Sequence, residues 1–208
     1  MLMRSPRTGS PEHRGFSLVE LLVVMAILAF VAAMSVPAIS GLTQGSTMNK
    51  NLLVLSGVLE QARQHAISKN TYVWVVLSLP ASVNDPVKVG QIASRDGTDV
   101  LAWSSAPQSL SSSSVLEMVG RPQELHLVKI ENSTRPDAGV ALANVNIQEG
   151  SGLCYTKAIQ FTPTGEARVS SSVARYIDVA MLQSAGTSPN QGILRIAGLT
   201  GRTSVRRE

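Results

Sequence analysis

The sequence predicts an α+β fold in which one long N-terminal helix packs on a largely antiparallel β-sheet. An apolar stretch long enough to cross a membrane occupies residues 16–36, and an amphipathic stretch with helical periodicity follows as far as residue 69. Only strand-like segments come after it, which is typical of an α+β protein. We therefore expect a basic leader (1–15), a transmembrane half of the helix (16–36), an amphipathic stalk half (37–69) and a β-rich head (70–208).

The apolar segment contains 21 residues and one charge, Glu20. As a helix it would span roughly 31 Å at ~1.5 Å per residue, which matches a hydrocarbon core of about 30 Å. Arg4, Arg7 and Arg14 precede the segment, and basic residues beside a membrane helix favour the cytoplasmic side. This pattern predicts a single-pass anchor whose head lies on the far side of the membrane.

Glu20 stands almost at the start of this apolar segment, where a charge is costly. A lone carboxylate in a spanning helix is by default a functional residue with a partner. If the chain is cut after Gly15, the new α-amino group of Phe16 could pair with Glu20 of a neighbouring copy, so that two costly charges compensate each other. Alternatively, Glu20 lies near the membrane interface and reaches water. Both interpretations remain open from the physics alone.

The second half of the helix should begin with a bend and end at Asn70. Pro37 lacks an N–H group and clashes with the preceding turn, so we expect a kink there. Apolar residues then recur at spacings of three and four, as on one face of a helix. These residues are Leu52, Leu55, Leu59, Ala62 and Ala66. This face should pack on the sheet.

The remainder of the chain alternates strand-like and turn-like segments. The stretch TYVWVVLSL (71–79) is β-branched and aromatic, which predicts a strand. Polar segments such as ASVNDP and AGTSPNQG are expected to be turns or loops. Further strands are expected at Val100–Ser104, Glu124–Glu131, Val140–Ile147, Lys157–Thr162, Arg175–Leu182 and Ile193–Ala197.

No pattern of reactive residues indicates an active site. The single cysteine, Cys154, excludes an internal disulfide and a CxxC pair, and we expect it to be a buried structural thiol. The three histidines are scattered, and no P-loop, GxSxG or HExxH motif is present. We expect no enzymatic activity, no metal and no cofactor.

The residues RGFSLVELLVVMAIL resemble the class III signal of type IV pilins and type II secretion pseudopilins. That family pattern is a short basic leader ending in Gly, then Phe, three residues, Glu and an apolar helix. The resemblance implies that a prepilin peptidase cuts after Gly15 and methylates Phe16. It also implies that Glu20 is the assembly carboxylate, and Pro37 falls where the long helix of the family commonly kinks.

Segments that follow the N-terminal signal are similar to the GspH/FimT family of minor pseudopilins. LEQARQHAISKNTYVWV resembles the helix end and first strand of that group, and IQFTPTGEARV and ILRIAGLTGRTSVRR resemble its last strands. The resemblance covers about residues 14–80 and 157–207. The TGRxxV ending is also similar to a branch known as Verru_Chthon cassette protein D.

The basic tail GLTGRTSVRRE suggests one further activity. Side chains alternate along a strand, so Arg202, Ser204 and Arg206 should share one face. Arginines beside a hydroxyl could contact phosphate, because guanidinium groups fit phosphate oxygens in pairs. Some FimT-like pilins bind DNA through a C-terminal Gly-Arg-x-Arg, but Ser204 stands at the fourth position here. The alternative is a solvated strand or a contact with a neighbouring subunit.

The sequence thus predicts a structural minor pilin or pseudopilin. The expected partners are prepilin peptidase, other pilins of the filament and inner-membrane lipid. Residues 16–36 should cross the bacterial inner membrane, with the N-terminus cytoplasmic and the head periplasmic. The subunit would enter a type II secretion pseudopilus or a type IV pilus-like filament. The two alternatives are a DNA-binding tip pilin for DNA uptake and an anchored periplasmic protein that never assembles.

Overall fold

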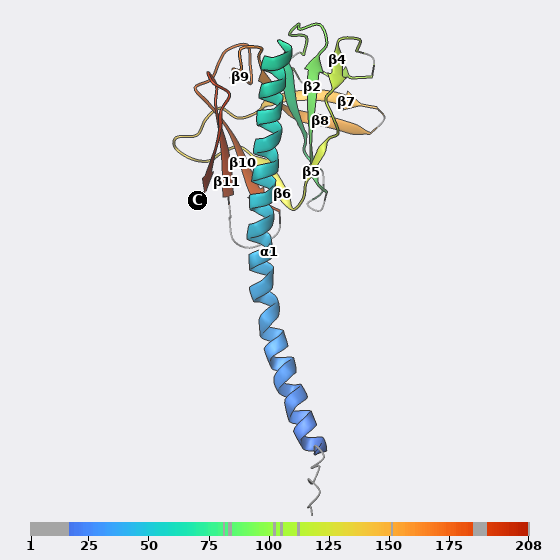
Figure 1. Ribbon diagram of the computed structural model, residues 1–208, viewed down its shortest axis with the longest axis vertical. Helices are drawn as coiled ribbons and strands as arrows, with labels where there is room; N and C mark the ends of the chain where they lie inside the picture. Colours follow the sequence, from blue (N-terminus) through green and yellow to red (C-terminus); the bar gives the residue numbers. More distant parts are fainter. Residues whose placement is uncertain are drawn as a thin grey trace, which may run out of the picture. The chain divides into compact units, whose positions relative to one another are not determined.

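The computed structural model contains one long helix followed by strands (Figure 1). It describes residues 17–80, 82, 85–101, 103–104, 106–111, 113–150, 152–184 and 191–207, except for the side chains of residues 34–45 and 207. The chain divides into two units, Met1–Leu42 and Thr43–Glu208, which are considered separately below. The helix, α1, covers Leu18–Lys69 and therefore contributes to both units.

Strands in the described part of the chain are numbered in sequence order. They are β1 (Val73–Ser78), β2 (Val87–Ser94), β3 (Gln108–Ser109), β4 (Leu116–Met118), β5 (Gln123–Leu125), β6 (Val128–Glu131), β7 (Ala143–Glu149), β8 (Leu153–Phe161), β9 (Ala167–Arg168), β10 (Tyr176–Gln183), β11 (Gln191–Ala197) and β12 (Thr203–Arg207). The order of one helix and then strands confirms the predicted α+β class.

The strands form two sheets. The larger sheet has the order β3-β7-β8-β1-β2-β4, with β5 and β9 paired to β2 and β8. The smaller sheet has the order β12-β11-β10-β6. Among the strand pairs of the described residues, only β3 and β7 run parallel, so the predicted antiparallel character is confirmed.

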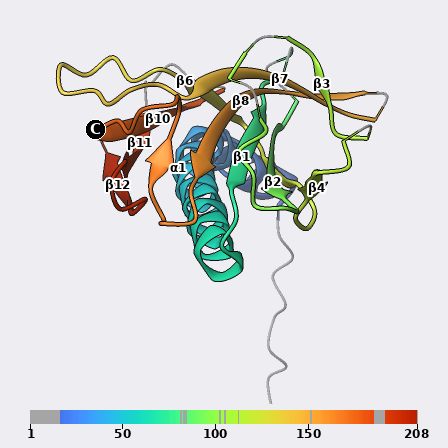
Figure 2. The ribbon, with the colours of Figure 1, turned by 90° about the horizontal axis from the view of Figure 1, so that it is seen from above.

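The second half of α1 packs on both sheets through the predicted face (Figure 2). Leu52, Leu55 and Leu59 are at most 2% exposed and lie in one core with apolar residues of β1, β8, β10 and β11. Burial of these side chains removes apolar surface from water, which is the main stabilising term for such a helix. The choice of helix face from periodicity is confirmed.

Asn70 ends the helix, as predicted. Its φ of 51° places it in the left-handed region, which Asn tolerates better than most residues. The N–H of Asn70 donates to the carbonyl of Ile67, and the N–H of Thr71 donates to the carbonyl of Ala66. These two bonds are the Schellman pair that satisfies the last carbonyls of a helix. The chain can then enter β1 after a short turn.

A second core lies on the other face of the larger sheet. Val73 and Val75 of β1 belong to the helix-side core, whereas Trp74 and Val76 belong to a separate cluster, because side chains alternate across a strand. The second cluster also contains residues from the segment between β2 and β4, including Leu101. Both faces of β1 are therefore buried, which explains its continuous apolar sequence.

Some predicted strand boundaries are wrong. Val100–Ser104 contains no strand among its described residues; instead Leu101 is buried from a loop. The segment predicted as one strand at Glu124–Glu131 is split into β5 and β6, which belong to different sheets, because Leu127 takes a positive φ of 59° between them.

Strand β2 was not predicted, because Gly90 and polar neighbours interrupt its pattern. A Cβ at Gly90 would lie 3.0 Å from the Tyr155 hydroxyl, so packing explains this glycine. Cys154 also differs from the expectation of a buried thiol, because it is only partly buried in β8.

Candidate functional site

The smaller sheet carries a buried ion pair on the face that points away from the helix-side core. Asp178 of β10 lies directly opposite Arg195 of β11. Nε and Nη2 of Arg195 each donate to one carboxylate oxygen of Asp178 at 2.8 Å, and both side chains are almost fully buried. The backbone N–H of Gly139 donates to the same carboxylate at 2.7 Å. This paired geometry is the strongest arrangement available to a guanidinium and a carboxylate.

The pKa values of the pair move in the directions that favour charge. Burial alone would raise the pKa of Asp178, but its hydrogen bonds with Arg195 and Gly139 outweigh burial and hold that pKa below the usual value. The hydrogen bond with Asp178 raises the pKa of Arg195. Both groups therefore remain ionised inside the sheet.

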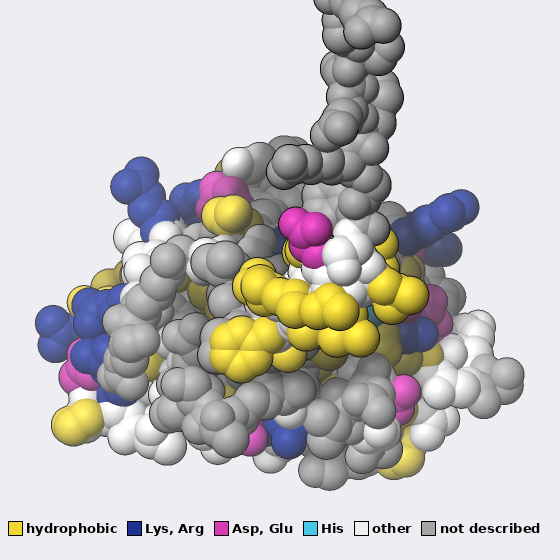
Figure 3. Space-filling model, turned by 90° about the horizontal axis from the view of Figure 1, so that it is seen from below, with side chains coloured by type: hydrophobic (Ala, Val, Ile, Leu, Met, Phe, Trp, Pro, Cys, Tyr) yellow, Lys and Arg dark blue, Asp and Glu magenta, His cyan; other side chains and the backbone are white. Residues whose placement is uncertain are grey.

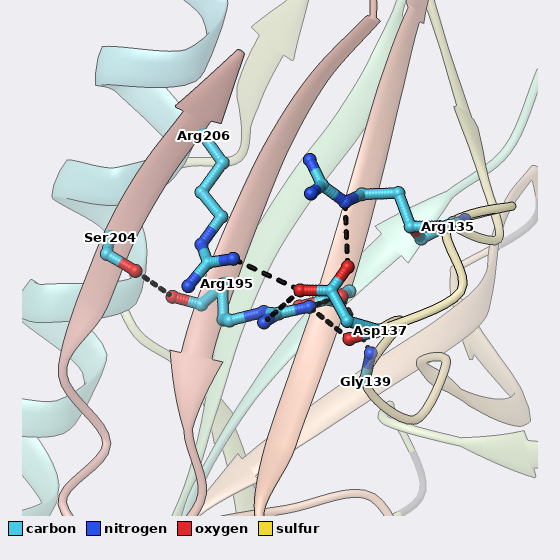
Figure 4. Close-up of polar contacts among 8 residues, drawn as sticks. Arg135, Asp137, Gly139, Arg195, Ser204 and Arg206 are labelled. Atoms are coloured by element: carbon cyan, nitrogen blue, oxygen red, sulfur yellow. Dashed lines mark hydrogen bonds and ion pairs between the residues drawn. The ribbon is translucent and has the colours of Figure 1, made fainter. Parts of the chain in front are cut away.

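Asp137 extends this pair into a cluster of three arginines (Figure 4). Its carboxylate accepts from Arg135 Nε at 2.9 Å, from Arg195 Nη1 at 3.2 Å and from Arg206 Nη1 at 3.2 Å. Its backbone carbonyl also accepts from Arg195 Nη2 at 2.6 Å. The hydrogen bond from Arg135 is the main reason why the pKa of Asp137 is lowered. The loop after β6 is thereby fastened to β11 and β12.

A shallow hollow of about 450 Å³ adjoins the cluster. It is lined by residues 137–140 and by Arg175, Tyr176 and Arg195. The guanidinium carbons of Arg175 and Arg195 lie 5.3 Å and 5.0 Å from the centroid of the Tyr176 ring. Such contacts are attractive because the ring face is electron-rich. The hollow thus combines an aromatic ring with cationic groups.

The three tail residues from the sequence analysis occupy different environments. Arg202 precedes β12 and is exposed, and its carbonyl accepts from the N–H of Ala197. Ser204 lies in β12, and its hydroxyl donates to the carbonyl of Arg195. Arg206, in the same strand, pairs with Asp137. Ser204 and Arg206 lie on the face of β12 that carries Arg195, because Ser204 is paired with Arg195 across the two strands, and Arg202 directly precedes the strand. The phosphate contact stays a prediction.

The N-terminal part of α1 is apolar on all sides. In the view from below, hydrophobic side chains gather where this end of the helix faces the viewer (Figure 3). A helix that is hydrophobic all round requires an apolar environment or a partner. The exposed apolar residues here are Leu18, Val19, Leu21, Leu22, Val23, Val24, Met25, Ile27, Leu28, Phe30 and Val31.

Glu20 lies in the first turn of α1 and is exposed. A carboxylate at this position interacts favourably with the positive end of the helix dipole. The predicted processing residues, Gly15 and Phe16, lie outside the described residues. Pro37 lies within α1, and because its side chain is among those not described, the predicted kink stays a prediction.

None of the helices in the described part of the chain combines the length and the apolar character that a membrane crossing requires. The transmembrane role of residues 16–36 is therefore still a prediction.

Comparison with known families identifies the N-terminal signal. Residues 12–36 match the prokaryotic N-terminal methylation motif. The motif indicates a type IV pilin-like precursor, which prepilin peptidase processes and which assembles with other pilins. No curated protein and no solved structure matches the chain.

The motif includes all three residues that the sequence analysis assigned to processing and assembly. Gly15, Phe16 and Glu20 lie within the matched range. By contrast, Asp137 and Asp178 were missed. One signal was available: Asp178 and Arg195 are single charges within two otherwise apolar strand segments, which suggests a cross-strand pair. Asp137 lies in a loop, where the sequence gives no register.

Proposed function

We propose that this protein is a structural subunit of a type IV pilin-like filament, specifically a minor pilin or pseudopilin without enzymatic activity. Prepilin peptidase cuts the chain after Gly15 and methylates Phe16. The apolar half of α1 anchors the mature subunit in the bacterial inner membrane, and the β-rich head lies in the periplasm. Assembly then joins the subunit to other pilins in a type II secretion pseudopilus or a related filament.

The observation that carries this proposal is the methylation motif joined directly to an exposed apolar helix. The motif covers residues 12–36, and the helix begins at Leu18 within it. The head packs on the stalk half of α1, with Leu55 and Leu59 buried against two sheets. The exposed apolar residues at the N-terminal end of α1 take no part in this core, so they are available for lipid and then for neighbouring subunits.

The head agrees with a relationship to the GspH/FimT minor pseudopilins, which the sequence resembles over its helix end and last strands. A stalk helix followed by two sheets is compatible with that group. The DNA-uptake alternative has less support. Arg206 is paired with Asp137, so its guanidinium is less available for a phosphate.

The proposal is tested by producing the full chain with and without an active prepilin peptidase. We expect a mature protein that begins at Phe16 and carries one added methyl group, measured by intact mass and N-terminal sequencing. Gly15→Val should block the cut, whereas Gly9→Val, the same change within the leader, should not. An unprocessed N-terminus in the presence of an active peptidase would contradict the proposal.

A further inference from the structure

The hollow beside the Asp137 cluster has an excess of positive charge. Four guanidinium groups surround two carboxylates, those of Asp137 and Asp178. Three of the four have a carboxylate partner: Arg135, Arg195 and Arg206. Three arginines against two carboxylates leave the cluster with one positive charge, and Arg175 at the hollow adds a second.

Arg175 differs from the other three arginines in its partners. It is exposed, it lines the hollow, and within the described residues no carboxylate pairs with it. Its guanidinium lies over the Tyr176 ring at 5.3 Å. Stacking on a ring holds the planar group while its N–H edges remain able to donate. Such an arrangement reduces the entropy lost when a carboxylate binds.

Val140 adds an apolar side chain to the lining of the hollow. Val140 is 52% exposed although its backbone is fixed on both sides. Its N–H donates to the carbonyl of Tyr176, and its carbonyl accepts from the N–H of Asp178. An exposed aliphatic side chain on a fixed backbone, in the same hollow as a cation, favours a ligand that has an apolar group next to an acid.

We propose that this hollow binds an acidic peptide segment of a partner protein. A carboxylate of the segment pairs with Arg175, and a neighbouring apolar side chain packs on Val140 and the Tyr176 ring. Asp137 argues against a nucleic acid. Its carboxylate is 49% exposed at the same site, and it would repel the successive phosphates of a polyanion. The site lies in the head, so the proposal does not depend on processing or filament assembly.

The experiment uses the full chain in detergent micelles and three labelled probes. The first is a peptide with one Glu next to a Leu among otherwise neutral residues and with blocked ends, the second has Gln in place of that Glu, and the third is a single-stranded thymidine oligonucleotide. Binding is followed by fluorescence anisotropy at low and moderate salt. We expect the acidic peptide to bind and the Gln peptide to bind at least about tenfold more weakly, since the paired charge is lost.

Arg175→Gln is the decisive variant, and Arg121→Gln is its matched control. Both arginines are exposed and the change in charge is the same, but Arg121 lies between β4 and β5, outside the cluster. Arg175→Gln should weaken the acidic peptide by about tenfold, whereas Arg121→Gln should change its affinity less than about twofold. Thermal unfolding of both variants should match that of the unchanged chain.

Three outcomes would overturn the proposal. Equal losses in the two variants would mean that the peptide responds only to overall charge. Equal binding of the Glu and Gln peptides would mean that no carboxylate is recognised. If the oligonucleotide binds and the peptide does not, and if Arg175→Gln weakens the oligonucleotide, then the hollow is a nucleic-acid site.

Discussion

Asp178 and Arg195 face each other across β10 and β11 as two buried charges joined by two hydrogen bonds of 2.8 Å. Burial of an ion pair is costly, and it is tolerated when the geometry is good and further hydrogen bonds satisfy the remaining atoms. Gly139 and Asp137 supply those hydrogen bonds. The smaller sheet is therefore held together on its outer face by charge and on its inner face by apolar packing.

Removal of one partner of this pair should destabilise the head strongly. Asp178→Asn keeps the shape but leaves the buried guanidinium of Arg195 without its main counter-charge. We expect the free energy of unfolding to fall by about 3–5 kcal/mol. Denaturant unfolding of the full chain in detergent, followed by tryptophan fluorescence, measures this loss.

Replacement of both partners should cost less. In Asp178→Leu with Arg195→Met no charge remains buried, and apolar pairs of similar volume are often neutral at such sites. If the single and double variants lose equal stability, then an unpaired buried charge is not the cause of the loss. The loss would instead come from the hydrogen bonds to the loop that contains Asp137 and Gly139.

Acid should weaken the head through the same carboxylates. The pKa of Asp178 is lowered in the folded state, because its hydrogen bonds with Arg195 and Gly139 outweigh the effect of burial. The pKa of Asp137 is lowered mainly by its hydrogen bond with Arg135. Their contribution is complete above the unfolded pKa of about 4 and is lost as the pH falls through the lower folded values. Unfolding should therefore become easier below about pH 4, and the Asp178→Leu, Arg195→Met variant should show a shallower dependence. Identical dependences would contradict this assignment.

The helix-side core makes a separate prediction. Leu55 and Leu59 are 1% exposed, whereas Leu53 on the same helix is 71% exposed. Replacement of Leu55 or Leu59 by Ala should lower the free energy of unfolding by about 2–5 kcal/mol, because a cavity remains. The same change at Leu53 should cost less than about 0.5 kcal/mol. A similar loss at all three positions would show that burial does not determine the result; helix propensity cannot explain such a loss, because Ala is the better helix former.

Local patterns made the helix predictable. The spacing of Leu52, Leu55 and Leu59 depends only on the period of one helix. Asn70 marks the end of that helix, because Asn tolerates the left-handed backbone conformation found there. Strands with clear β-branched runs, such as β1 and β10, were also predictable. The division into β5 and β6 at Leu127 was not predictable. Tertiary contacts decide which sheet each of these two segments joins.

The two parts of the candidate site differ in the same way. The N-terminal signal is contiguous in sequence, so the motif at residues 12–36 could be recognised directly, whereas the roles of Gly15, Phe16 and Glu20 within it stay predictions. The Asp137 cluster joins residues from a loop and three strands, with Arg195 and Asp137 separated by 58 positions. Its assembly depends on the strand register, which a single sequence does not specify.

The final prediction concerns Glu20, which is exposed in the first turn of α1. If its carboxylate forms an ion pair with the Phe16 ammonium of a neighbouring subunit, then Glu20 stabilises only the assembled filament. Glu20→Gln should be cut after Gly15 and should keep a folded head, but it should enter assemblies poorly, because the neutral amide lacks an attraction that is large where water is scarce. Crosslinking of the subunit to its partners in membranes, with processing followed on the same blot, measures this. Glu12→Gln, the same change within the leader, is the control, since the leader is absent from the mature chain. Equal crosslinking in Glu20→Gln and the unchanged protein would leave Glu20 only the role of stabilising the first helical turn.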